Sequence, residues 1–432
     1  MSVTSETRKS WQVCATCGDR LSEFDSSARC DCGGLLDIVH PAPPSTGEEL
    51  RGLLEARRTA FEGPAASGVW RFRELVLPSA GLDVVSHPEG NTPILERASV
   101  SRWAGVSRLE LKHEGHNPTG SFKDRGMTVG MTQARRIEAS AVACASTGNT
   151  AASLAAYAAH AGIPCLVLVP KGRIAAGKLA QALAYGARTL LVRDGFDGCL
   201  ALIDRASREL GVYLLNSINP FRIEGQKTIV FELLQQLAWS PPDWLVVPAG
   251  NLGNTAAFGK ALREAVEWGL IERFPRIAAV QAEGAAPFAQ SYREDFATRH
   301  EVTPDTVATA IRIGNPASYD RAVRAIRETD GVVTTATDEQ ILEAKAVIDA
   351  AGIGCEPASA AAVAGVRRLV REGVIDSSQR VVAVLTGHIL KDPELLLAYH
   401  QTTEPAPPKA NRPIEIDADL DQLARVLDRS AR

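Results

Sequence analysis

The chain has 432 residues, of which 45% are hydrophobic, so it can bury a large core and form two or three domains. Its 47 basic and 51 acidic residues give a formal net charge of −4, which argues against nucleic-acid binding. The sequence shows no signal-peptide pattern and no run approaching 18 apolar residues. We therefore expect a cytoplasmic protein without a membrane partner.

Four of the eight cysteines lie in the first 32 residues, as CxxC, twelve residues, then CxC. Thiolates at this spacing can converge on one tetrahedral zinc ion, and the glycines in "CGDR" and "CGG" allow the tight turns that this needs. We predict a zinc ribbon over residues 1–40, with two disulfides or a decayed site as alternatives. The predicted metal ligands are Cys14, Cys17, Cys30 and Cys32. The remaining four are expected to be core residues: Cys144, Cys165, Cys199 and Cys355.

After the predicted ribbon, "PAPPSTGEEL" reads as a linker into a helix from about Glu48 to Glu62. From residue 139 short apolar strands alternate with helices, which predicts a parallel sheet covered on both faces. The predicted strands are 139–146, 163–170, 188–193 and 211–217, and the helices are 149–162, 175–186 and 197–210. A second α/β region follows, with predicted strands 244–250, 277–283 and 381–387.

Two α/β regions with ligand loops at strand ends predict an active site in the cleft between them. We expect a catalytic domain over residues 46–400, with a smaller subdomain at about 128–235 inserted in the larger one. Residues 401–432 are expected to form a proline-rich tail with a terminal helix. One face of that helix carries Leu420, Leu423, Val426 and Leu427. Such a face favours docking or an oligomer contact, and we expect a homodimer.

Polar loops follow three of these strands. "ASTGNTAAS" presents the amide of Asn149 at the start of a helix, where a plain helix cap is the alternative. "LTGHILKD" presents the hydroxyl of Thr386 at a strand end. "PAGNLGN" precedes another helix, and its glycines and helix-start N–H groups suit a phosphate. The residues of this phosphate loop are Gly250, Asn251, Leu252, Gly253 and Asn254.

The stretch "NPTGSFKDRGM" carries Lys123 among small and turn-forming residues. An arbitrary lysine beside an acid such as Asp124 is normally exposed. Here a lysine, a phosphate loop, an amide and a strand-end hydroxyl occur together, and pyridoxal phosphate requires these groups. Lys123 could form the Schiff base, the amide of Asn149 could donate to the phenolic oxygen, and the hydroxyl of Thr386 could face the pyridine nitrogen.

Six segments in consistent order resemble the threonine synthase family of pyridoxal-phosphate enzymes, whose fold is that of the tryptophan synthase β-subunit (fold type II). They are "HNPTGSFKDRGM", "ACASTGNTAASLAAYAAHAG", "VPAGNLGN", "AIRIGNPAS", "EPASAAAVAG" and "LTGHILKD". The resemblance runs from about Trp70 to about Pro393. It implies an α/β protein with two parallel-sheet subdomains and an active site in the cleft, and some family members carry a similar N-terminal ribbon.

By this resemblance, Lys123 is the catalytic lysine that binds the cofactor, and Asn149, the phosphate loop and Thr386 bind the rest of it. The segment "NSINPFRIEGQK" is similar to the family's site for the substrate phosphate. An arginine suits that role because its guanidinium offers paired donors and a permanent charge. The implied substrate-binding residues are Ser146, Thr147, Thr150, Asn216, Ser217 and Arg222.

The implied reaction converts O-phospho-L-homoserine and water into L-threonine and phosphate, so we expect a lyase of threonine biosynthesis with Lys123 as the general base at the α-carbon. Cysteate synthase is the closest alternative, because it also takes a phosphorylated amino acid. A dehydratase is disfavoured because "GNLGN" interrupts the glycine run of that class. A catalytically silent zinc-ribbon scaffold is disfavoured by the retained Lys123.

One residue departs from the family pattern. Ile389 stands where the family usually has glycine. If that position required a positive φ, a β-branched residue would be strained there and the loop would be reshaped. A different loop would favour a modified substrate, such as an analogue of phosphohomoserine in specialised metabolism.

Overall fold

A computed structural model describes residues 9–171, 176–193, 195–402, 405, 407 and 409–430. The chain forms two compact units, which divide at Asp392. The start of the predicted helix 175–186 and part of the proline-rich stretch lie outside the described residues. No helix in the described part of the chain is both long and apolar enough to cross a membrane.

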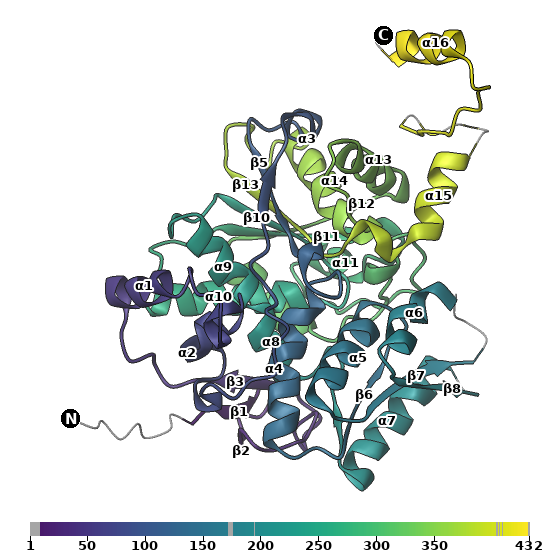
Figure 1. The fold of residues 1–432 in the computed structure, drawn as a ribbon. Coiled ribbons are helices and arrows are strands. Elements are labelled where there is room, and N and C mark those ends of the chain that lie inside the picture. The colour runs from purple at the N-terminus through teal and green to yellow at the C-terminus, as the bar shows by residue number, and fades with distance from the viewer. Residues whose placement is uncertain are drawn as a thin grey trace. The chain divides into compact units, whose positions relative to one another are not determined.

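The strands form three sheets (Figure 1). The strands are β1 (Trp11–Cys14), β2 (Arg20–Ser22), β3 (Leu36–Val39), β4 (Ile94–Glu96), β5 (Leu109–His113), β6 (Ala141–Ala145), β7 (Cys165–Pro170), β8 (Arg188–Val192), β9 (Val212–Leu214), β10 (Trp244–Pro248), β11 (Arg276–Ala282), β12 (Val332–Ala336) and β13 (Val381–Leu385). Their orders are β2-β1-β3, β8-β7-β6-β9 and β12-β11-β10-β13-β5-β4. The four-stranded sheet is parallel, and the six-stranded sheet is parallel except for the antiparallel edge strand β4.

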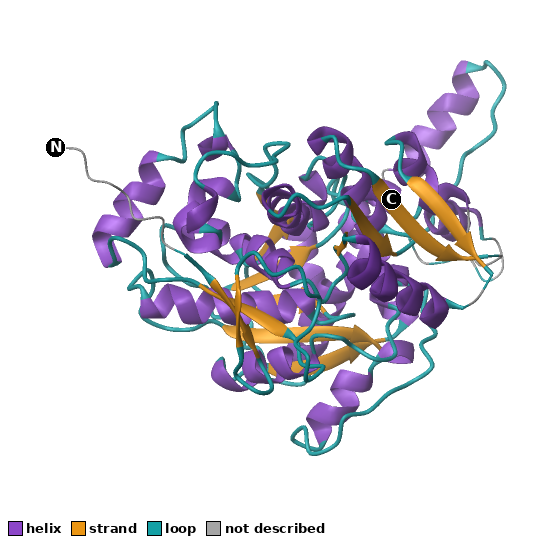
Figure 2. Ribbon diagram, turned by 90° about the horizontal axis from the view of Figure 1, so that it is seen from below, coloured by secondary structure: helices purple, strands orange, loops and turns teal. Residues whose placement is uncertain are grey.

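In the compact unit that ends at Lys391, helices surround the sheets (Figure 2). They are α1 (Gly47–Ala56), α2 (Arg73–Val76), α3 (Ala98–Ala104), α4 (Lys123–Arg136), α5 (Asn149–Ala161), α6 (Ala176–Ala184), α7 (Phe196–Leu210), α8 (Pro220–Gln226), α9 (Thr228–Gln236), α10 (Gly253–Glu267), α11 (Pro287–Arg293), α12 (Tyr319–Glu328), α13 (Asp338–Ala350) and α14 (Pro357–Arg371). The second unit contains α15 (Pro393–Gln401) and α16 (Leu420–Ser430). Alpha helix α5 is alanine-rich and ends at Gly162, whose φ of 68° a glycine adopts readily.

Alternate residues of the buried strands belong to different cores, so both faces of each parallel sheet are covered. In β10, Leu245 and Val247 join one core, while Trp244 and Val246 join another. The smaller sheet divides in the same way, since Val142 and Ala143 of β6 lie in separate cores. This confirms the expected parallel α/β architecture.

The chain enters and leaves the smaller sheet along two helices that pack closely against each other. From β5 it runs through α4 to β6, and from β9 it returns through α8 and α9 to β10. Both the first residue of α4, Lys123, and a residue of α8, Arg222, therefore lie where the two sheets are connected.

The N-terminal segment folds as an antiparallel sheet, β1 to β3. Gly18 and Gly33 adopt φ values of 80° and 84°, as the predicted tight turns after the cysteine pairs require. The four sulfur atoms of Cys14, Cys17, Cys30 and Cys32 all lie within 4.8 Å of one another. The other four cysteines are buried, as expected.

One expectation about local structure is corrected. The predicted helix 48–62 ends at Ala56, and the next residue, Arg57, binds the carboxylate of Glu74 at 2.5 and 2.7 Å. Ile389 begins a short 3-10 turn and is not among the described residues with positive φ, so the strain of a β-branched residue at positive φ does not arise there. Its side chain packs on Gly354, at which an added Cβ would lie 3.1 Å from Ile389 Cδ1.

Candidate active site

Lys123 begins α4 next to the end of β13. The N–H of Phe122 donates to the carbonyl of Thr386 at 3.0 Å, which fixes the lysine beside that strand end. Lys123 keeps some exposed surface, but burial and, secondarily, the charge of Arg222 lower the pKa of its amine to about 7. An amine with this pKa is partly uncharged at neutral pH, as a nucleophile or base requires.

The residue after the lysine ties α4 to its neighbours. The Asp124 carboxylate accepts hydrogen bonds from Thr119 N (2.7 Å), Thr119 Oγ1 (2.6 Å) and, from α5, Ser153 Oγ (2.6 Å). Burial raises the pKa of Asp124 to about 6. Asp124 is thus buried and connects α4 to Thr119 and to α5. It is not exposed, as the acidic neighbour of a surface lysine would be.

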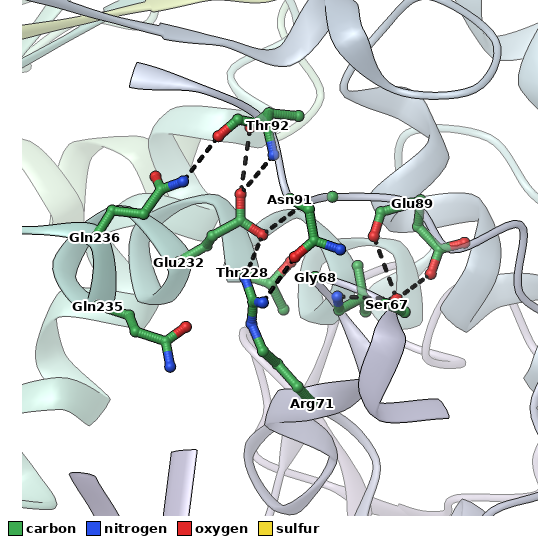
Figure 3. Close-up of polar contacts among 12 residues, drawn as sticks. Ser67, Gly68, Arg71, Glu89, Asn91, Thr92, Thr228, Glu232, Gln235 and Gln236 are labelled. Carbon is green, nitrogen blue, oxygen red and sulfur yellow. Dashed lines mark hydrogen bonds and ion pairs between the residues drawn. The ribbon is translucent and has the colours of Figure 1, made fainter. Parts of the chain in front are cut away.

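Arg125 holds the first turn of α4 from the other side through a buried ionic cluster. Its guanidinium donates to Glu114 at 2.7 and 2.8 Å and to Glu232 of α9 at 2.8 Å. Glu232 also accepts from Arg71 at 2.8 Å and from the N–H of Asn91 at 2.8 Å (Figure 3). These contacts leave the start of α4 little freedom to move.

A carboxylate that the sequence analysis did not single out connects two of the predicted residues. Glu356, which is 1% exposed, accepts from Asn149 Nδ2 at 2.9 Å and from Thr386 Oγ1 at 3.1 Å. Ser359 Oγ lies 3.0 Å from Thr386 Oγ1 and accepts from Gly387 N. The structure therefore brings Asn149 and Thr386 to a common acceptor.

The predicted phosphate loop forms a tight turn at the start of α10. Leu252 has a φ of 63°, so the left-handed position is taken by leucine and not by a glycine. Gly250 serves close approach instead, since an added Cβ would lie 2.8 Å from Ile311 Cα. Two buried oxygens, Asn254 Oδ1 and Thr255 Oγ1, have no hydrogen-bond partner within the described chain.

The predicted substrate-binding residues fall into two groups. Ser146, Thr147 and Thr150 are half-buried at the start of α5. Asn216 supports that loop, because its Oδ1 accepts from Ala145 N at 3.0 Å. Ser217 contacts the phosphate loop, where its hydroxyl accepts from Asn251 Nδ2 at 2.5 Å.

Arg222 is fully buried and only partly paired. Its Nη1 donates to Leu215 O at 3.1 Å, whereas Nε and Nη2 have no partner among the residues that the structure describes. Burial lowers the pKa of Arg222 to about 10, so it stays charged at neutral pH. A buried cation with free donors is costly and is best explained by an anionic ligand.

Comparison with known proteins identifies the family. Residues 85–387 match the model of the family described as pyridoxal-phosphate dependent enzymes. A threonine synthase of Methanocaldococcus jannaschii is 42% identical over 96% of this chain and 99% of its own. Threonine synthase 2 of Arabidopsis thaliana, a chloroplastic protein, is 39% identical over 92% of this chain and 80% of its own. The chain belongs to the threonine synthase family.

Solved structures agree on the fold of this threonine synthase family member. The structure of Escherichia coli threonine synthase covers 95% of the chain and 94% of its own, with a TM-score of 0.70 and 18% identity. A threonine deaminase of Solanum lycopersicum covers 83% of this chain and 95% of its own, with a TM-score of 0.63 and 21% identity. At these identities the likeness shows the fold alone, which is the predicted fold type II.

The residues present fit the cofactor of the family. Lys123 supplies an amine of lowered pKa, and Thr386 and Asn149 supply polar groups on either side of Glu356. The α10 terminus adds N–H groups that have no intrahelical acceptor. Beside this loop the buried hydroxyl of Thr255 has no partner among the described residues, and it can donate a hydrogen bond to a phosphate oxygen.

Proposed function

We propose that this protein is a threonine synthase that converts O-phospho-L-homoserine and water into L-threonine and phosphate, with pyridoxal phosphate bound at Lys123. Bound there, the cofactor would withdraw electrons from the substrate and acidify the hydrogen on its α-carbon. The amine of Lys123, with a pKa of about 7, is suited to take that proton and return it. Asn149, Thr386 and the loop 250–254 would hold the cofactor.

The observation that carries this proposal is the incompletely paired guanidinium of Arg222, whose charge helps to lower the pKa of Lys123. The phosphate of the cofactor would bind at the loop before α10. The separate buried cation of Arg222 therefore supports a site for a second anion, the phosphate of the substrate. Asn216, Ser217 and Thr150 would complete this site. Its placement near Lys123 also argues against a silent scaffold.

The test is to substitute Arg222 by alanine. Arg222→Ala should keep the visible colour of the bound cofactor and lose about a hundredfold or more in kcat/KM for phosphohomoserine, because a bidentate charged contact is removed. Lysine at the same position should restore part of the loss. If the wild-type enzyme turned over unphosphorylated homoserine as well as phosphohomoserine, the proposed second anion site would be contradicted. Phosphoserine with sulfite tests the cysteate synthase alternative.

We also propose that Cys14, Cys17, Cys30 and Cys32 bind one structural zinc ion. Support comes from the convergence of their sulfur atoms within 4.8 Å and from the absence of disulfides among the described cysteines. Four thiolates close the coordination sphere and leave no position for a substrate. A site of four thiolates needs reduced cysteines, so we also propose a reducing, cytoplasmic location. We retain a homodimer as the proposed assembly.

A further inference from the structure

The ribbon, defined as residues 9–40, is bound to the catalytic body by buried polar contacts. On one side Arg321 of α12 donates to the carbonyl of Leu36 and pairs with Asp37 (2.7 Å). On the other side the ribbon lies against α4 and α8, the helices of Lys123 and Arg222. The second contact links the ribbon to the candidate active site.

A continuous chain of hydrogen bonds crosses the ribbon from α4 to α8. At the last residue of α4, Arg136 Nη2 donates to Glu23 Oε1 at 3.0 Å, and Glu23 Oε2 accepts from Ser10 N at 2.9 Å. The hydroxyl of Ser10 lies 2.7 Å from His40 Nδ1. His40 Nε2 lies 2.6 Å from Glu224 Oε2 in α8. The side chains of Glu23, His40 and Glu224 are at most 2% exposed, so water competes little for these bonds.

The directions of these bonds are fixed by the chemistry of the groups. Burial lowers the pKa of His40, so its imidazole is neutral at pH 7 and has one donor and one acceptor nitrogen. The Glu224 carboxylate only accepts, so Nε2 carries the hydrogen and Nδ1 accepts from the hydroxyl of Ser10. Every polar atom of the imidazole is then satisfied.

The two helices joined by this chain cannot shift independently. An added Cβ on Gly225 would lie 1.8 Å from the carbonyl oxygen of Arg125, so only glycine permits the contact between α8 and α4. An added Cβ on Gly126 would lie 3.2 Å from the Cβ of Arg222. Arg222 is therefore packed directly against the first turn of the helix that begins with Lys123.

Glu224 also binds two lysines that lie outside the ribbon. Lys227, at the junction of α8 and α9, lies 2.5 Å from Glu224 Oε2, and Lys260 of α10 binds Oε1. Lys260 also donates to the carbonyl of Ile38 in the ribbon. Without His40, the carboxylate would be held only by these lysines, and the turn of α8 that carries Arg222 would lose its direct side-chain bond to the ribbon.

We propose that His40 is a positioning residue for Arg222, so that the ribbon sets the affinity of the enzyme for the phosphate group of its substrate. This inference rests on the proposed role of Arg222. It assigns the ribbon a task in substrate recognition in addition to a structural one. Ser10 and Glu23 contribute by orienting the imidazole.

The test compares two substitutions of His40 in the full-length holoenzyme. The amide of His40→Asn can reach Ser10 but is too short for Glu224, whereas the longer His40→Gln can donate to Glu224. In His40→Asn the KM for phosphohomoserine and the inhibition constant of inorganic phosphate should rise together by about tenfold, as expected for loss of one hydrogen bond to a charged group. The visible spectrum and kcat should be unchanged, and His40→Gln should lie closer to the wild type.

A matched control breaks the ribbon's contact with α12 instead. Asp37→Asn removes the ion pair with Arg321 without touching the chain of bonds to Glu224, so it should leave both phosphate constants unchanged. An equal rise in Asp37→Asn would overturn the inference, as would normal phosphate constants in folded His40→Asn. If His40→Asn does not fold, Ser10→Ala replaces it, with an expected rise of about threefold.

The outcome also separates this inference from the proposed function. If Arg222→Ala leaves the inhibition constant of inorganic phosphate unchanged, the second anion site itself is wrong. If Arg222→Ala weakens phosphate binding and His40→Asn does not, only the role of His40 is wrong.

Discussion

Lys123 and Arg222 are two basic side chains in one site, and burial leaves them with different charge states near neutral pH. The lysine has a titratable amine, and burial together with the nearby guanidinium shifts its pKa to about 7. The arginine stays charged, because its pKa falls only to about 10. One group is thereby suited to exchange protons near neutral pH and the other to hold an anion.

In protein freed of its cofactor, labelling of Lys123 by an amine-reactive reagent should show a midpoint near pH 7, against about 10.4 for an ordinary lysine. The uncharged amine is the reactive form, so the rate should rise as the pH passes through this value. Arg222→Ala removes a repelling cation and should raise the midpoint. Peptide mapping by mass spectrometry gives the rate at Lys123. A wild-type midpoint near 10 would show that the amine is not desolvated.

Glu356→Gln should loosen the cofactor. A carboxylate accepts from both Asn149 and Thr386, whereas an amide has only one acceptor oxygen. If that oxygen accepts from Asn149, the amide nitrogen must donate to Thr386, and the Thr386 hydroxyl loses its charged acceptor and must turn its hydrogen elsewhere. The dissociation constant of pyridoxal phosphate should rise by about tenfold to a hundredfold, for loss of one hydrogen bond to a charged group. Equilibrium dialysis measures it, and Glu356→Asp serves as the charge-retaining control. An unchanged constant would rule out this role.

Single residues differ in how far the sequence predicts their place. Lys123, Asn149 and Thr386 stand in distinctive loops. The structure places Lys123 near Thr386, because the N–H of the preceding Phe122 donates to the Thr386 carbonyl. Glu356 precedes Pro357 at the start of a helix and reads as an ordinary helix-start acid. Its contact with Asn149 spans 207 residues, and only the tertiary fold brings the two together.

Among the secondary-structure elements, strands dominated by apolar residues were predicted from the sequence, whereas the more highly charged strand β5 was not. Strand β10 reads Trp-Leu-Val-Val-Pro and strand β13 reads Val-Val-Ala-Val-Leu, and such uncharged apolar runs have the pattern of buried parallel strands. Strand β5 reads Leu-Glu-Leu-Lys-His and is nevertheless fully buried. Its charges are tolerated because Glu110 binds Arg380 at 2.7 Å and Lys112 binds Glu232 at 2.6 Å. These partners are distant in sequence, so a local pattern gives no sign of them.

Loss of the proposed zinc ion should lower the stability of the protein more than it lowers the rate of the chemical step. Chelation, or Cys14→Ser with Cys17→Ser, removes ligands of a closed four-thiolate site, so the free energy of unfolding should fall by several kcal/mol. The kcat of the protein that remains folded should change by less than about threefold. Calorimetry and elemental analysis of reduced protein provide the measurements, with Cys199→Ser as a control outside the cluster. Freely reactive thiols and no metal in fresh wild-type protein would exclude the site.

For the molecule as a whole, the division at Asp392 separates the catalytic body from a segment with an apolar helix face. In α16 the side chains of Leu420, Leu423 and Leu427 are 79%, 45% and 64% exposed. Three large apolar side chains on one face of a helix favour a contact with another surface. This supports the expected contact role, and the compact unit before Asp392 should fold without it.

Deletion of residues 403–432 should leave the melting temperature of the body and its turnover nearly unchanged, because these residues lie outside the compact unit that ends at Lys391. Self-association should weaken, since the apolar face of α16 is lost. Light scattering after gel filtration measures the mass. Leu423→Asp with Leu427→Asp, in the full-length chain, should reproduce the effect. If the truncated protein had the same number of chains per particle as the full-length protein, α16 would not mediate assembly.

The way the ribbon is bound has a consequence for biosynthesis. Its residues leave the ribosome early, yet Glu224 and Arg321, which bind it, are made much later, and the contact between Leu36 and Arg321 spans 285 residues. Domains fold during synthesis in order from the N-terminus, whereas contacts this distant form late. Until α8 and α12 are made, the nascent ribbon has only its own sheet and its cysteine cluster to hold it. With the proposed zinc site, the supply of metal during translation would then affect the yield of folded enzyme.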